Sequence, residues 1–215
     1  MIGVIIPAHN EQQHLGACID SVLRSALHIG LQSEEVVVLV VLDACTDASA
    51  LVAQRHGAMI MPVDYRNVGR ARSAGARVML DAGARWLAFT DADTLVSPNW
   101  LERQVSFKAD AVCGTVRVDS WADHSPVAQA RYDAHYQHTE GHRHVHGANL
   151  GVCAIAYNKV GGFKPLPAHE DVHLVKDLQG VGANIIWTAT TSVITSARRD
   201  FRCREGFGEY LQSLA

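Results

Sequence analysis

The sequence has few cysteines and no long apolar run. Its five cysteines are an odd number and form no Cys-x-x-Cys motif, which argues against a disulfide framework and against a cysteine-based zinc site. No apolar run approaches the roughly 20 residues that a membrane-spanning helix needs. The apolar stretch 2–6 runs directly into Pro7, so we expect neither a signal peptide nor a transmembrane segment. These absences predict a cytoplasmic protein.

An excess of charge of one sign is lacking as well. The net charge is −3 and the pI is near 6.4, so no overall field attracts nucleic acid or an anionic membrane. With 215 residues, of which 48% are hydrophobic, the chain is long enough for one well-buried domain and too short for two. It contains no internal repeat and no long linker rich in proline, glycine or serine, so we expect a single domain.

Short β-branched runs alternate with segments of helical period. Strands that are apolar almost throughout, joined by helices, predict an α/β domain whose mostly parallel central sheet carries helices on both faces. The expected strands cover residues 2–6, 36–42, 58–62, 86–90, 111–118 and 184–187. The expected helices cover residues 11–27, 46–56, 67–82, 98–107, 126–140 and 171–179. In such sheets, ligands bind beyond the carboxyl ends of the strands.

Three polar segments, 7–11, 43–47 and 90–94, follow expected strands at that edge. The third contains the Asp91-x-Asp93 pair, and paired carboxylates suit a hard divalent ion such as Mg²⁺ or Mn²⁺. About one such pair is expected by chance in a chain of this composition, so its position after a strand carries the prediction. The alternative is that Asp93 caps a turn while Asp91 pairs with an arginine.

Seven segments in this order resemble family 2 glycosyltransferases with the GT-A fold. In sequence letters they are VIIPAHNE (4–11), VVLDACTD (40–47), NVGRARSAG (67–75), FTDAD (89–93), GANL (147–150), VGGF (160–163) and HEDVHL (169–174). The resemblance extends over roughly residues 2–195. The second segment departs from the family, which usually has two adjacent aspartates followed by Gly-Ser. Here Leu42, Ala44 and Cys45 surround Asp43, which leaves the shape of this turn open.

The resemblance implies a nucleotide-sugar donor, most simply a UDP-sugar, a divalent metal ion (Mg²⁺ or Mn²⁺) and a hydroxyl acceptor. It also implies a GT-A domain over residues 1–195, with a nucleotide-sugar-binding half (1–95) and an acceptor half (96–195), followed by a basic tail (196–215). The metal ligands implied are Asp93 and Asp91. The donor contacts implied are Pro7, His9, Glu11, Asp43, Arg70 and Asp91. Arg70 and Arg72 would contact the diphosphate or hold Asp91 in place, unless they lie on a solvated helix face.

By the same resemblance, Asp171 is the expected general base, which takes the proton of the acceptor hydroxyl during inversion by single displacement. Glu170 would orient it or cap the helix. The alternative is that both carboxylates only complement the helix dipole. His144 and His146 are expected on the acceptor side.

Other interpretations remain open. A retaining transferase or a nucleotidyltransferase would use a similar sheet, although residues 7–13 lack the glycines of a phosphate loop. A catalytically silent nucleotide-sugar-binding protein is a third option. A dinucleotide-binding oxidoreductase is disfavoured because no Gly-x-Gly-x-x-Gly follows the first strand. The sequence identifies neither the acceptor, which could be a saccharide, a lipid or a small molecule, nor the assembly state, with a homodimer among the options.

Three further features have two interpretations each. The histidines in 135–146 form a zinc site or a polar loop on the acceptor side. The aromatic residues Trp121, Tyr132 and Tyr136 stack on a sugar or pack in the core. The arginines at 198, 199, 202 and 204 clamp a phosphate or form a solvated tail.

Overall fold

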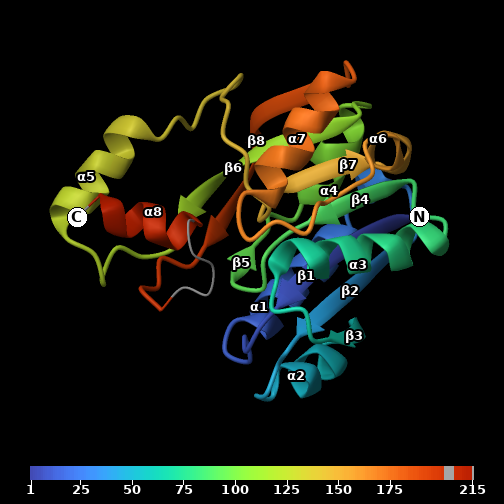
Figure 1. The fold of residues 1–215 in the computed structure, drawn as a ribbon, viewed down its shortest axis with the longest axis horizontal. Coiled ribbons are helices and arrows are strands. Elements are labelled where there is room, and N and C mark those ends of the chain that lie inside the picture. The colour runs from blue at the N-terminus through green and yellow to red at the C-terminus, as the bar shows by residue number, and fades with distance from the viewer. Residues whose placement is uncertain (201–205, 215) are drawn as a thin grey trace.

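A mixed eight-stranded sheet lies at the centre of the computed structural model, which describes residues 1–200 and 206–214 (Figure 1). The spatial order of its strands is β3-β2-β1-β4-β7-β6-β8-β5. They are β1 (Ile2–Ala8), β2 (Val36–Asp43), β3 (Met59–Val63), β4 (Trp86–Phe89), β5 (Thr94–Leu95), β6 (Ala111–Val118), β7 (Leu150–Cys153) and β8 (Ile185–Thr195). Four neighbouring pairs are parallel, whereas β7 runs antiparallel to β4 and β6 and β5 runs antiparallel to β8. The predicted α/β class with a mostly parallel sheet is confirmed.

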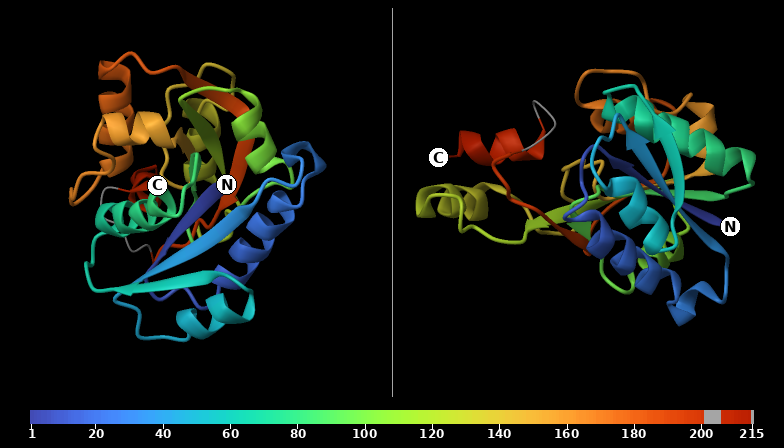
Figure 2. Two further views of the ribbon diagram at one scale, coloured as in Figure 1. Left: turned by 90° about the vertical axis from the view of Figure 1, so that its right-hand side faces the viewer. Right: turned by 90° about the horizontal axis from the view of Figure 1, so that it is seen from below.

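Helices connect the strands and cover the sheet (Figures 1 and 2). They are α1 (Leu15–Ala26), α2 (Ser49–Arg55), α3 (Val68–Asp81), α4 (Trp100–Ser106), α5 (Pro126–His135), α6 (Ala154–Lys159), α7 (Glu170–Gly180) and α8 (Phe207–Ser213), with one 3-10 turn at Ile29–Leu31. Within the described residues no helix is long and apolar enough to cross a lipid bilayer.

The two faces of the sheet carry separate apolar cores, because successive side chains of a strand point to opposite sides. Val4 of β1 packs in one core with the buried side of α1, whereas its neighbour Ile5 packs in the other with α3 and α7. Gly75 permits the close approach of α3, since a Cβ there would lie 2.6 Å from Ile5 Cγ2 and 2.8 Å from Val41 Cγ2. Helices on both faces are therefore confirmed.

Several elements differ from the prediction. The sequence pattern missed β7 and α6, which are short. It ended the last strand at residue 187, whereas β8 continues to Thr195 through a threonine-rich run that is polar in composition but β-branched. Helix α1 begins at Leu15 rather than at residue 11; residues 12–14 form a turn, and Asn10 before them adopts a left-handed conformation with φ of 55°. Helix α5 ends at His135 rather than at residue 140.

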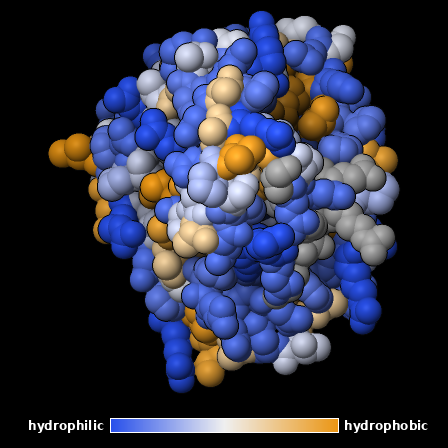
Figure 3. Space-filling model, turned by 90° about the vertical axis from the view of Figure 1, so that its left-hand side faces the viewer, coloured by the Kyte–Doolittle hydropathy of each residue, from blue (hydrophilic) through white to orange (hydrophobic). Residues whose placement is uncertain are grey.

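Part of the predicted basic tail is packed against the rest of the chain. Helix α8 lies beside α5, beyond the ends of β6 and β8 (Figures 1 and 2). Leu211 of α8 is fully buried and forms a third apolar cluster with Tyr132 and Tyr136. The surface at this end of the molecule is mostly hydrophilic, with separate apolar patches (Figure 3). The expected arginines 202 and 204 lie outside the described residues.

Candidate active site

A cavity of about 980 Å³ opens at the carboxyl ends of β1, β2 and β4. The loops that follow these strands form one side of it. Residues 144–148 and 167–172 form another, and residues 195–198 and 206–210 of the predicted tail complete it. It contains all the sequence-predicted site residues except Arg70: they are Pro7, His9, Glu11, Asp43, Asp91, Asp93, His144, His146, Glu170 and Asp171. Residues far apart in the sequence thus share one cavity.

The loops after β1 and β2 are held together by side-chain hydrogen bonds. Asn10 Oδ1 accepts the main-chain N–H of Thr46 at 2.8 Å and that of Asp47 at 3.3 Å. The N–H of Glu11 donates to Ser49 Oγ at 2.9 Å. A ring nitrogen of His9, Nδ1, lies 2.6 Å from the carbonyl oxygen of Asp43. These bonds restrain Glu11 and His9 before any ligand binds.

Asp43 organises the start of α3, a role that the sequence pattern did not indicate. Its Oδ1 accepts the main-chain N–H groups of Tyr65 and Arg66 at 2.6 and 2.8 Å, and its Oδ2 accepts that of Asn67 at 2.8 Å. A carboxylate has about four lone-pair positions, so about one remains for a ligand. Any contact of the Asp43 carboxylate with a bound nucleotide would have to use that remaining lone pair.

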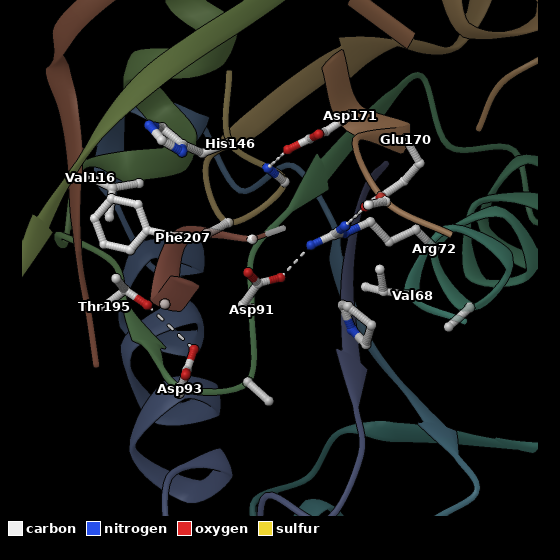
Figure 4. Close-up of a pocket in the computed structure, with 18 of the residues that line it drawn as sticks. Val68, Arg72, Asp91, Asp93, Val116, His146, Glu170, Asp171, Thr195 and Phe207 are labelled. Atoms are coloured by element: carbon white, nitrogen blue, oxygen red, sulfur yellow. Dashed lines mark hydrogen bonds and ion pairs between the residues drawn. The ribbon is translucent and has the colours of Figure 1, made fainter. Parts of the chain in front are cut away.

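Arg72 connects two walls of the cavity. Its Nη2 lies 2.5 Å from Asp91 Oδ1, and its Nη1 contacts Glu170 Oε1 (Figure 4). The side chains of Arg72 and Glu170 are only 5% and 4% exposed, so removing either would leave a buried charge without its partner. Of the two roles expected for the arginines, Arg72 has the second: it holds Asp91 in place. A Cβ at Gly147 would lie 2.4 Å from the guanidinium, so this arrangement requires glycine there.

Arg70 does not lie at this cavity, in contrast to the predicted donor contact. Its guanidinium lies 4.3 Å from the ring centre of Tyr65 and lines a separate, smaller pocket. Residues two apart on a helix point to different sides, so when Arg72 faces Asp91 its neighbour Arg70 faces elsewhere. The structure therefore places Arg72, and not Arg70, at the cavity.

Asp171 stands at the start of α7 and faces the cavity (Figure 4). Its Oδ2 accepts the N–H of Gly147 at 2.6 Å, and its Oδ1 accepts the N–H of Val172 at 2.7 Å. Each oxygen keeps a further lone pair for a hydroxyl. The adjacent Glu170 is bound to Arg72 instead. Burial raises the pKa of Glu170, and the nearby Arg72 opposes this rise.

Asp93 lies at the cavity beside Arg198, a cation of the predicted tail. Arg198 contacts both Glu11 oxygens, and its Nη2 lies 3.2 Å from Asp93 Oδ2. Thr195 donates to Asp93 Oδ1 at 3.3 Å (Figure 4). Burial and the repulsion of Asp91 raise the pKa of Asp93 to about 6, although Arg198 opposes this rise. A cation bound here would favour the ionised carboxylate.

The available atoms fit a hard divalent ion. Asp91 keeps one oxygen that Arg72 does not bind, and Asp93 offers a second carboxylate. Mg²⁺ is often held by one or two carboxylates and completes its coordination with phosphate oxygens and water. Within the described residues, no group of three or more His, Cys, Asp or Glu side chains could hold a metal ion. A metal in this cavity would therefore share its coordination with the donor.

The histidine-rich stretch forms a stack of rings, two of which line the cavity. The ring of His144 lies parallel to that of Tyr136, with their centres 4.1 Å apart. The N–H of Gln137 donates to His144 Nε2, and the N–H of His144 donates to His142 Nδ1, each at 3.1 Å. Both nitrogens are therefore acceptors, and the rings are neutral. The rings stack instead of converging on a point, which disfavours a zinc site.

Tyr136 also determines the proton position on His146. Its hydroxyl accepts the N–H of Val116 at 3.0 Å and lies 2.7 Å from His146 Nε2. Because the tyrosine proton needs an acceptor, Nε2 is the acceptor and Nδ1 carries the proton. Burial, followed by His144, lowers the pKa of His146 to about 3, so the ring remains neutral at physiological pH. The aromatic residues of α5 pack with α8, and Phe207, which the sequence analysis did not consider, joins the cavity wall (Figure 4).

A comparison with protein families identifies the family of the chain. The family described as "Glycosyl transferase family 2" matches residues 3–157. The chain belongs to glycosyl transferase family 2. The GT-A resemblance of the seven sequence segments is thereby confirmed.

Individual relatives agree with this assignment. The glycosyltransferase GlyA of Streptococcus pneumoniae is 26% identical over 122 residues, which are 53% of this chain and 16% of GlyA. S. aureus TarS 1–349, solved with UDP-GlcNAc, superimposes with a TM-score of 0.70 at 14% identity over 94% of this chain and 60% of its own. The mannosyltransferase PcManGT of Pyrobaculum calidifontis, solved with GDP-Man and Mn²⁺, has a TM-score of 0.70 at 17% identity over 93% of this chain and 57% of its own. The chain therefore spans less than two thirds of these proteins.

Proposed function

We propose that this chain transfers a sugar from a nucleotide-diphosphate donor, most simply a UDP-sugar, to a hydroxyl acceptor. The observation that carries the proposal is one cavity in which carboxylates at three strand ends face Asp171 on the opposite wall, in a chain of family 2. The complexes of similar structures with UDP-GlcNAc and with GDP-Man support a nucleotide-sugar ligand.

On the donor side, Pro7, His9, Glu11 and Asp43 would hold the nucleoside, with Asp91 near the ribose. Asp93 and the free oxygen of Asp91 would hold Mg²⁺ or Mn²⁺, which supplies positive charge to the diphosphate leaving group. Two similar structures, PcManGT and GalNAc-T7, were solved with Mn²⁺, which supports this choice of ion. Arg72 keeps Asp91 oriented throughout. Arg70 is not part of the proposal because it lies outside the cavity.

On the acceptor side, Asp171 takes the proton from the attacking hydroxyl. The N–H of Gly147 fixes one carboxylate oxygen, and the remaining lone pairs can accept from the acceptor. A carboxylate that acts directly on the acceptor hydroxyl favours single displacement with inversion at the anomeric carbon. Neutral His146, and His144 behind it, would contact the acceptor. Glu170 acts through Arg72.

The test is calorimetric binding of UDP, GDP and CDP, with and without Mn²⁺, followed by measurement of nucleotide release from the matching nucleotide sugars. Binding of UDP or GDP in the micromolar range together with slow donor hydrolysis supports the transferase. Binding without any release, in the presence of Mn²⁺ and a panel of sugar acceptors, would support a silent nucleotide-sugar-binding protein instead. Failure to bind any nucleotide would contradict the proposal.

A further inference from the structure

Arg198 neutralises carboxylates at the position where a donor-bound cation is expected. Its guanidinium bridges Glu11 and Asp93, whose side chains are 6% and 17% exposed. Arg72 does not neutralise Glu11 or Asp93, because its guanidinium pairs with Asp91 and Glu170. Within residues 1–200 and 206–214, Arg198 is the arginine that pairs with Glu11 and Asp93. The cavity thus contains a side-chain cation at these two carboxylates.

The pairing leaves part of the guanidinium unused. Arg198 binds through its two terminal nitrogens, whereas its Nε is buried and has no hydrogen-bond partner among the described residues. A guanidinium has five N–H donors arranged as a fork that matches phosphate oxygens. A diphosphate next to Arg198 would offer an acceptor to Nε as well. The guanidinium therefore keeps a donor that its contacts with Glu11 and Asp93 do not use.

The backbone beneath Arg198 is anchored independently of its side chain. The N–H of Ser196 donates to the carbonyl oxygen of Asp93 at 3.2 Å, and the N–H of Ala197 donates to Asp119 Oδ1 at 3.0 Å. Rotation of the long side chain can therefore move the charge while the main chain stays in place.

We propose that Arg198 is a displaceable internal counter-ion. In the ligand-free chain it occupies the cation position at Glu11 and Asp93. A divalent ion that binds Asp93 repels the guanidinium, which then contacts the diphosphate that arrives with the ion. The proposal rests on the proposed function, since it assumes a metal-bound nucleotide donor. It makes donor and metal binding mutually dependent, because the metal releases the residue that the diphosphate uses.

The first experiment measures binding of Mn²⁺ alone, without nucleotide, by electron paramagnetic resonance in the wild type, Arg198→Gln and Arg199→Gln. Arg199 is the matched control because it is adjacent and exposed and changes the net charge equally. We expect Arg198→Gln to bind Mn²⁺ about tenfold more tightly or better, since a unit charge some 4 Å from a divalent ion is lost. Arg199→Gln should resemble the wild type. Equal or weaker Mn²⁺ binding by Arg198→Gln, or no Mn²⁺ binding by any variant, would overturn the proposal.

The second experiment measures UDP and GDP binding by the same variants with saturating Mn²⁺ and with EDTA. Loss of a charged hydrogen-bond donor to the diphosphate should weaken nucleotide binding to Arg198→Gln by roughly 10- to 150-fold in Mn²⁺. Unchanged nucleotide binding by Arg198→Gln would refute the proposed contact between Arg198 and the diphosphate. A different result would be a wild type that binds nucleotide equally well in Mn²⁺ and in EDTA, while Arg198→Gln binds none. In that case Arg198 replaces the metal permanently, and the proposed displacement of Arg198 by the metal is wrong. A wild type that binds no nucleotide at all would instead contradict the proposed function. Melting curves, together with Arg198→Lys, show whether a failed variant is folded.

Discussion

Replacing Asp171 by asparagine separates proton transfer from binding. The side chain keeps its size but loses one oxygen. In the wild type, the main-chain N–H groups of Gly147 and Val172 each donate to one of the two carboxylate oxygens. An amide offers only one oxygen, so one N–H faces an NH₂ group. At this half-buried position, the lost bond costs about 1 kcal/mol of folding stability. For a chain of this size, the melting temperature should fall by about 2–4 °C.

The effect on turnover is expected to be much larger. A missing general base lowers the rate by roughly 10²–10⁴-fold. Nucleotide affinity should stay within a factor of about three, because Asp171 is not among the residues proposed to hold the nucleoside. The assay is nucleotide release from the donor at saturating concentration, compared with calorimetric binding of the nucleotide. Asp177→Asn is the control, since Asp177 lies on the same helix α7 but does not line the cavity. If affinity falls while saturated turnover is retained, Asp171 is a donor contact or a helix cap and the base assignment is wrong.

Three further predictions concern single side chains of the same cavity. Asp43→Asn should destabilise the fold by about 1–3 kcal/mol in urea unfolding, because the amide keeps one oxygen and loses the charge, so that at least one of the three N–H groups faces an NH₂ group; an unchanged midpoint would refute its structural role. Burial raises the pKa of Asp93 to about 6 from 3.8, so the ionised carboxylate opposes folding increasingly between about pH 4 and pH 6 and fully above that range. Asp93→Asn should therefore be more stable than the wild type at pH 7 by up to roughly 3 kcal/mol, a gain that disappears below about pH 4. A gain that persists at pH 4 would contradict this linkage. Tyr136→Phe removes the proton that His146 Nε2 accepts, so the ¹⁵N spectrum of His146 should change from a single Nδ1–H tautomer to a mixture; a mixture already present in the wild type would refute the assignment.

The sequence alone determined the parallel part of the sheet and the edge at which ligands gather. Apolar strands that end in Asp43 and in Asp91-x-Asp93 specify this edge, because parallel neighbours bring their carboxyl ends together. These features are local in the chain: short apolar β-branched runs, a helical period, and a polar segment directly after the strands. Such patterns can be read without knowledge of the fold. The family resemblance added the role expected for Asp171, which local chemistry alone would have assigned to helix capping.

Only the tertiary structure decided which charges meet. Arg72, and not Arg70, reaches Asp91, because the side of α3 that packs on the sheet sets the direction of every other side chain on the helix. The pair of Arg198 and Glu11 joins residues 187 positions apart, and no local pattern indicates it. Phe207 reaches the cavity only because α8 packs against the aromatic residues of α5. Contacts of this kind depend on the tertiary packing of segments that are far apart in the sequence. Periodicity and composition do not describe that packing.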